Sequence, residues 1–194
     1  MGALHRKLHE QRGASMLMAL FLLLVALMVS AVVIAAASSA ATTLRSDKAQ
    51  EQSSLAVSSA AEYVRDAFLG KEMDGTIVTQ GTSTTYTSDS GGAFRDFVSY
   101  AVPELYRNQN ALPRRTYRLR LSEDTVEDVW ADFEMSFGQN ENTEYPTYIL
   151  TVTLRNWETT PGEHPCSMTL LLCSNLGGSN RRAVTWDGYN VIQR

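Results

Sequence analysis

The sequence predicts an α+β fold in which a long N-terminal helix, transmembrane in its first half, packs on an antiparallel β-meander sheet. Two observations predict it. No residue from Gly13 to Leu44 is charged, and the following residues 45–69 contain neither glycine nor proline. In the C-terminal part of the chain, apolar and polar side chains alternate in five runs, which is typical of half-buried strands.

The composition limits the classes of function. The chain has 194 residues, 44% of them hydrophobic, which suits one domain plus an anchor. Lys and Arg number 17 against 21 Asp and Glu, and no basic block exceeds two residues, so we expect no nucleic-acid partner. Two cysteines are too few for a disulfide framework or a four-cysteine zinc site.

The apolar segment is long enough to cross a membrane. Its densest part, Met16 to Ala37, has 22 residues and a single polar interruption at Ser30. About 20 apolar residues span a bilayer as a helix. The residues before the uncharged run carry a net charge of +2 and residues 45–194 carry −6. The positive-inside rule then predicts a cytoplasmic N-terminus and an extracytoplasmic C-terminal domain.

The residues Gln11-Arg12-Gly13-Ala14-Ser15-Met16-Leu17 resemble the class III leader junction of type IV pilins and type II secretion pseudopilins. The resemblance covers about residues 5–69. It implies that a prepilin peptidase cuts between Gly13 and Ala14 on the cytoplasmic side. It also implies that the new amine of Ala14 is methylated, while the apolar helix stays in the membrane until it packs in a filament. The implied partners are membrane lipid, the prepilin peptidase and other pilin-like subunits.

The sequence departs from this family at the fifth mature position. Most members carry Glu there, where it can pair with the amine of a neighbouring subunit, and this chain has Met18. Within the family, the lack of this Glu resembles the minor pseudopilin placed at the filament tip. The resemblance therefore implies a minor subunit, as tip or initiator, of a type IV pilus, a DNA-uptake filament or a type II secretion-like filament.

Two other hypotheses about the function remain open. One is a single-pass, membrane-anchored extracytoplasmic binding module. The other is an exported soluble protein that signal peptidase releases near Ala35-Ala36-Ala37, although the apolar stretch exceeds the roughly 7–15 residues of a signal-peptide core. The first residue of the mature protein distinguishes them: Ala14 for the pilin-like protein, Met1 for the anchored module and a start near Ser38 for release.

We expect four parts: a cytoplasmic leader peptide (1–13), a transmembrane helix (14–44), an extracytoplasmic continuation of that helix (45–69) and a globular α+β domain (70–194). Gly70 has the position of a C-cap residue. Serine and threonine lower the helix propensity of 38–44, which makes a kink or local melting there an alternative. One apolar stripe with helical spacing marks the packing face of the continuation: Val57, Ala60, Ala61, Val64 and Phe68.

The middle of the chain predicts two small elements. Residues 76–90 are rich in threonine and serine and predict a partial hairpin. Residues 93–110 have helical spacing with Pro103 inside, which predicts a short helix that breaks or kinks at that proline.

The five strand-like runs are 116–121, 129–137, 147–155, 167–173 and 182–192, with a bulge or bend at Gly188. We expect the first two runs to pair with residue 120 opposite 132. This register places Arg120 against Asp132 and Arg118 against Glu134 on the solvent face, while the apolar side chains meet on the other face.

Candidate chemistry is sparse. There is no nucleophile elbow, HExxH motif or phosphate loop, so we expect no enzymatic activity, catalytic residue or cofactor. A nucleophilic Cys166 activated by His164 is an alternative. Cys166 and Cys173 are too far apart on one strand to bond, so we expect small buried apolar side chains. The densest acidic stretch would suit calcium, but it lacks EF-hand spacing and we expect a solvated hairpin loop; its members are Glu123, Asp124, Glu127, Asp128, Asp132 and Glu134.

Overall fold

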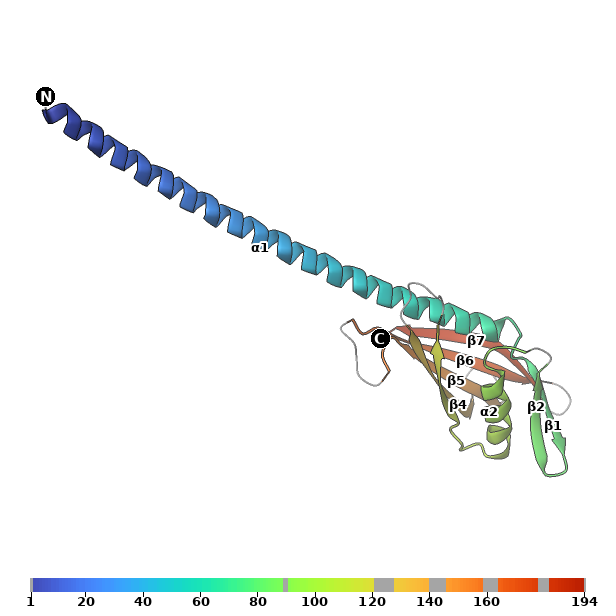
Figure 1. The fold of residues 1–194 in the computed structure, drawn as a ribbon. Helices are drawn as coiled ribbons and strands as arrows, with labels where there is room; N and C mark the ends of the chain where they lie inside the picture. The colour runs from blue at the N-terminus through green and yellow to red at the C-terminus, as the bar shows by residue number, and fades with distance from the viewer. Residues whose placement is uncertain are drawn as a thin grey trace. The chain divides into compact units, whose positions relative to one another are not determined.

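The computed structural model describes residues 2–88, 91–120, 128–139, 146–158, 164–177 and 182–193. Two compact units divide the chain, 1–48 and 49–194, so the last helical turns before the sheet belong to the same unit as the sheet. The elements in chain order are α1 Gly2–Leu69, β1 Gly75–Gln80, β2 Ser83–Ser88, α2 Arg95–Arg107, β3 Arg114–Leu119, β4 Val129–Gln139, β5 Pro146–Arg155, β6 Ser167–Gly177 and β7 Ala183–Gln193 (Figure 1).

The strands form one antiparallel sheet in the order β2-β1-β7-β6-β5-β4-β3. The five predicted runs are β3 to β7, and their alternation of buried and half-buried residues confirms the predicted meander and the α+β class. The predicted partial hairpin is a full one and adds two strands, because β1 also pairs with β7. Its two-residue loop begins with Gly81 at φ 61°, the left-handed conformation that a type II′ hairpin turn requires.

The predicted register between the first two runs is wrong by four residues. Thr116, not Arg120, lies opposite Asp132, and Arg118 lies opposite Trp130. The face assignment survives because a shift by an even number of residues keeps every side chain on its own side. Leu121, the last residue of the predicted strand, lies outside the described residues.

A bulge interrupts the pairing of β6 with β7. Cys173 pairs with Gly188 and Ser174 with Trp186, which leaves Asp187 as the extra residue. The bulge or bend predicted at Gly188 is therefore confirmed as a bulge next to that residue.

Helix α1 continues through the serine- and threonine-rich segment without interruption. Thr42 Oγ1 donates to the carbonyl of Ser38 at 2.9 Å, and Thr43 Oγ1 donates to the carbonyl of Ser39 at 3.1 Å. These hydroxyls use the helix's own carbonyls as acceptors, so they do not melt it locally.

The C-terminus of α1 is close to the prediction. The backbone N–H of Gly70 donates to Asp66 O at 2.8 Å, and a Cβ at Gly70 would lie 2.5 Å from that oxygen. Glycine is needed here for the close approach. The left-handed residue is the next one, Lys71, at φ 67°.

The core lies between the two helices and one face of the sheet. Phe133 of β4 is 1% exposed and contacts Phe68 of α1 and Phe94 at the start of α2, with ring centroids 6.4 and 4.8 Å away. Ring contacts with Phe97 and Tyr117 extend this aromatic cluster. The buried stripe predicted on α1 is confirmed, since each of its five residues is at most 6% exposed.

Helix α2 runs through Pro103 to Arg107, so the predicted break at this proline is wrong. Val102 and Leu105, on either side of it, are 0% exposed, and Pro103 is itself buried. Packing on both sides of the missing N–H thus outweighs the lost helical hydrogen bond.

A buried, unpaired phenol gives the first prediction. Tyr148 is 0% exposed and its Oη has no hydrogen-bond partner among the described residues, whereas the Oη of Tyr86 donates to Met73 O. Burial raises the pKa of both tyrosines, so both stay protonated. Tyr148→Phe removes no bond and should leave the free energy of unfolding unchanged or about 1 kcal/mol higher, while Tyr86→Phe should lower it by about 1 kcal/mol.

The measurement is urea unfolding of the full chain in detergent, monitored by tryptophan fluorescence. Tyr86→Phe is the matched control, because it removes the same atom from another buried ring. A larger loss for Tyr148→Phe than for Tyr86→Phe would contradict the unpaired state of the Tyr148 hydroxyl.

Candidate functional site

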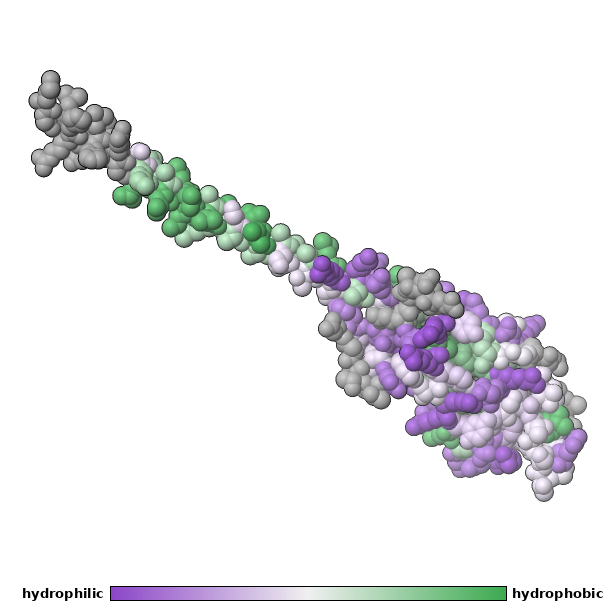
Figure 2. All heavy atoms as spheres, in the orientation of Figure 1, coloured by the Kyte–Doolittle hydropathy of each residue, from purple (hydrophilic) through white to green (hydrophobic). Residues whose placement is uncertain are grey.

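The uncharged segment of α1 is the most extensive exposed apolar surface of the described chain. Between Met16 and Ile34 its large side chains are 40–75% exposed. None of the most apolar part of this segment is buried. Figure 2 shows this stretch as a band of hydrophobic side chains. The helix is thus long and apolar enough to serve as a single-pass membrane anchor.

The one polar residue within the densest apolar part needs no partner from outside the helix. Ser30 Oγ donates to the carbonyl of Ala26, one turn back, at 2.8 Å. In hydrocarbon an unsatisfied hydroxyl would be costly, and this bond removes the cost. The segment therefore suits a lipid environment.

The predicted junction residues Gly13 and Ala14 lie within α1, directly before the apolar segment. Their side chains are not among those described, and cleavage stays a prediction. Met18, at the expected fifth mature position, is 68% exposed. An apolar side chain here extends the band to the beginning of the segment.

A buried polar junction joins α1 to the β5–β6 connection. Ser53 is 0% exposed and its Oγ donates to His164 O at 2.8 Å. Asn156 Nδ2 donates to the same carbonyl at 2.8 Å and also to Ser53 Oγ, and Asn156 Oδ1 accepts from the backbone N–H of Cys166 at 2.8 Å. The sequence does not predict this junction, because no spacing or motif connects residue 53 with residues 156, 164 and 166.

His164 and Cys166 both take part in the polar junction through their backbone atoms. His164 contributes its backbone carbonyl to the junction, and no hydrogen bond joins its ring to the Cys166 sulfur among the described residues. Both cysteines are free and half-buried, less buried than predicted. Burial, with the charge of Asp187, raises the pKa of Cys173 and keeps that thiol protonated.

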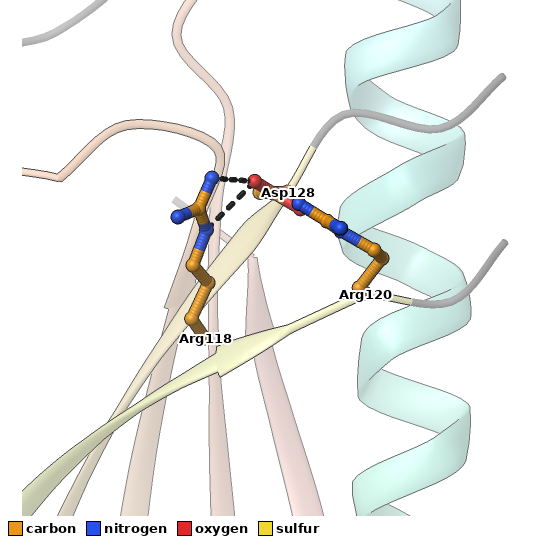
Figure 3. Close-up of polar contacts among 3 residues, drawn as sticks. All are labelled: Arg118, Arg120 and Asp128. Carbon is orange, nitrogen blue, oxygen red and sulfur yellow. Dashed lines mark hydrogen bonds and ion pairs between the residues drawn. The ribbon is translucent and has the colours of Figure 1, made fainter. Parts of the chain in front are cut away.

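The described members of the acidic stretch bind arginines. Figure 3 shows Arg118 and Arg120 pointing toward Asp128: Arg118 Nε lies 2.7 Å from Oδ2, and Arg120 Nε lies 3.2 Å from Oδ1. Hydrogen bonds from Arg120 and Arg118 hold the pKa of Asp128 below its ordinary value.

Asp132 binds Arg155, whose Nη2 lies 2.9 Å from Oδ2, and Glu134 binds Arg114, whose Nε lies 2.7 Å from Oε2. These pairs replace the predicted partners Arg120 and Arg118, because the register differs by four residues. Burial tends to raise the pKa of Asp132, but hydrogen bonds from Arg155 and Thr116 outweigh it and lower that pKa. Within the described ranges no three potential metal ligands come together; Glu123, Asp124 and Glu127 lie outside those ranges.

No protein-family model matches the chain, and searches of curated proteins and of solved structures found no match.

Proposed function

We propose that the chain is a non-enzymatic structural protein, a minor pilin-like or pseudopilin-like subunit of a type IV pilus, DNA-uptake or type II secretion-like filament. Its N-terminus lies in the cytoplasm, one helix crosses the membrane, and the compact unit 49–194 lies outside the cytoplasm. A prepilin peptidase removes residues 1–13, and the amine of Ala14 is methylated. Met18, where an acid would pair with a neighbour's amine, favours a tip or initiating position over that of a bulk subunit.

The observation that carries the proposal is that α1 is one element with two kinds of surface. From Ser15 to Leu44 its side chains are exposed and uncharged, and from Ser53 to Phe68 one stripe is buried against a sheet. A tether for a binding domain needs no such packing. A subunit that is first held in lipid and then packed in a filament uses the exposed part in both states, while the buried part belongs to the core of the compact unit.

Helical continuity also bears on release by signal peptidase. Ala35-Ala36-Ala37 lies inside α1, and the helix continues for 32 residues beyond Ala37, to Leu69. Residues 38–69 include the buried stripe that completes the core. Release at this place would leave a helix with several exposed turns before Ser53, which favours retention of the anchor.

The experiment is the identity of the mature N-terminus. The chain is expressed in a host that contains a prepilin peptidase and analysed by intact mass and N-terminal peptide mapping. We expect a mature chain that begins at Ala14 and carries one added methyl group. A chain that begins at Met1 would support the anchored binding module, and one that begins near Ser38 would support release; either result overturns the proposal.

A further inference from the structure

We propose that Arg45 and Lys48 bind the anionic phospholipid headgroups of the leaflet at the outer end of the apolar segment, and thereby set the depth at which α1 sits in the membrane. This inference rests on the proposed membrane insertion of α1. Both side chains are exposed, and neither has an ion-pair partner among the described residues. We call the two residues the juxtamembrane pair.

The apolar segment alone does not define a depth. The uncharged run of 32 residues measures about 48 Å as a helix, whereas the hydrocarbon layer of a bilayer is about 30 Å thick. Thr42 and Thr43 do not prevent sliding, because their hydroxyls donate to carbonyls of the helix itself. Contacts at the ends of the run must therefore determine how deep the helix sits in the bilayer.

The juxtamembrane pair lies at the right height for such a contact. If Met16 to Ala37 fills the hydrocarbon, Arg45 is eight residues further on, about 12 Å along the helix axis. Side chains on a helix lean toward its N-terminus and cover the preceding turn, which here is the membrane side. The guanidinium group then lies about 7 Å beyond the hydrocarbon, in a headgroup layer about 5–8 Å thick. Lys48 follows one turn later, within about one Debye length of that layer.

The pair also faces one side of the helix. At about 100° per residue, Lys48 lies roughly 60° around the axis from Arg45, while Asp47 lies about 160° away from Arg45. Glu51, the next acid, is a turn further from the membrane than Lys48. The basic side chains can therefore approach anionic headgroups without bringing these carboxylates to the same place. No tyrosine or tryptophan precedes Tyr63 in the chain, so no aromatic belt competes to fix the depth.

The lysines of the chain allow a direct test. They are Lys7, Lys48 and Lys71, and Lys71 is an exposed residue of the compact unit. The full chain is reconstituted in nanodiscs of phosphatidylcholine alone, or with 30 mol% phosphatidylglycerol, and acetylated with a neutral reagent. Mass spectrometry then gives the ratio of the acetylation rates of Lys48 and Lys71. Resistance to alkaline carbonate extraction from matched vesicles reports insertion independently.

We expect the Lys48 to Lys71 ratio to fall about threefold in the anionic discs, and to recover in about 0.5 M salt, since each basic residue at an anionic surface changes such an equilibrium by about fivefold when fully engaged. Arg45→Gln should remove most of this protection, while Arg65→Gln, a matched change in the compact unit, should not. A ratio that is equal in both lipids, or protection that persists in Arg45→Gln, overturns the inference. Loss of the chain on carbonate extraction would instead overturn the membrane part of the proposed function.

Discussion

Gly13→Leu should abolish maturation of the chain. A peptidase that cuts between residues 13 and 14 must approach the backbone closely, and the leucine side chain would obstruct it. The variant should remain in the membrane fraction as a precursor 13 residues longer than the mature chain. Because a precursor keeps its leader at the cytoplasmic end of the apolar segment, it should also be absent from sheared filaments. Intact mass and immunoblotting of the two fractions measure both effects.

Ala3→Leu is the matched control for this experiment. It adds the same side chain within the leader but ten residues away from the junction. We expect the control to mature to the same mass as the unchanged chain. If Gly13→Leu also matures to that mass, the leader assignment is wrong, whatever the fold of the compact unit.

Phe133→Ala should cause the largest loss of stability. The ring is 1% exposed and contacts four other rings, with centroid distances of 4.8 Å to Phe94, 5.1 Å to Tyr117, 5.6 Å to Phe97 and 6.4 Å to Phe68. Two helices and two strands meet at this side chain, so the structure cannot collapse easily into the space it leaves. We expect the free energy of unfolding to fall by about 3–5 kcal/mol.

The full chain in detergent is again unfolded with urea, and near-ultraviolet circular dichroism reports the aromatic packing. Phe21→Ala is the matched control, because this ring is 63% exposed in the apolar segment and contributes nothing to the core. This substitution should leave the urea concentration at the unfolding midpoint unchanged. Equal midpoints for Phe133→Ala and Phe21→Ala would mean that the aromatic cluster does not stabilise the compact unit.

Periodicity in the sequence predicts which side chains are buried better than it predicts which strands meet where. The alternating apolar residues of the runs 147–155 and 167–173 are all buried, as the alternation predicts: Leu150, Val152 and Leu154 of β5, and Met168, Leu170 and Leu172 of β6. The register of β3 with β4 was not accessible in this way, because the observed and the predicted pairings both satisfy the two faces and both offer arginine partners to the acids.

Features that depend on tertiary packing could not be predicted from the sequence either. Pro103 predicts a break because a proline lacks the N–H of a helix, but its buried neighbours Val102 and Leu105 belong to a helix that packs on β2 and β4, and this packing keeps α2 continuous. Ser53 would be an exposed polar residue by composition, but it is buried and bonded to Asn156 and to the carbonyl of His164, both more than 100 residues further along the chain. For the candidate site, the apolar segment was predictable from length and charge alone, whereas the pairing of Arg118 and Arg120 with Asp128 was not.

The position of β3 at the end of the sheet has a consequence for how copies of this protein meet at high concentration. An edge strand offers free backbone groups to any other strand, and many proteins aggregate by this route. Three of the six residues of β3 are arginines, Arg114, Arg115 and Arg118, and their side chains are 49–67% exposed. Two such edges brought together would place like charges against each other. Strand addition at the β3 edge is thus disfavoured, whereas β2, at the other end of the sheet, carries no charged residue that would oppose it.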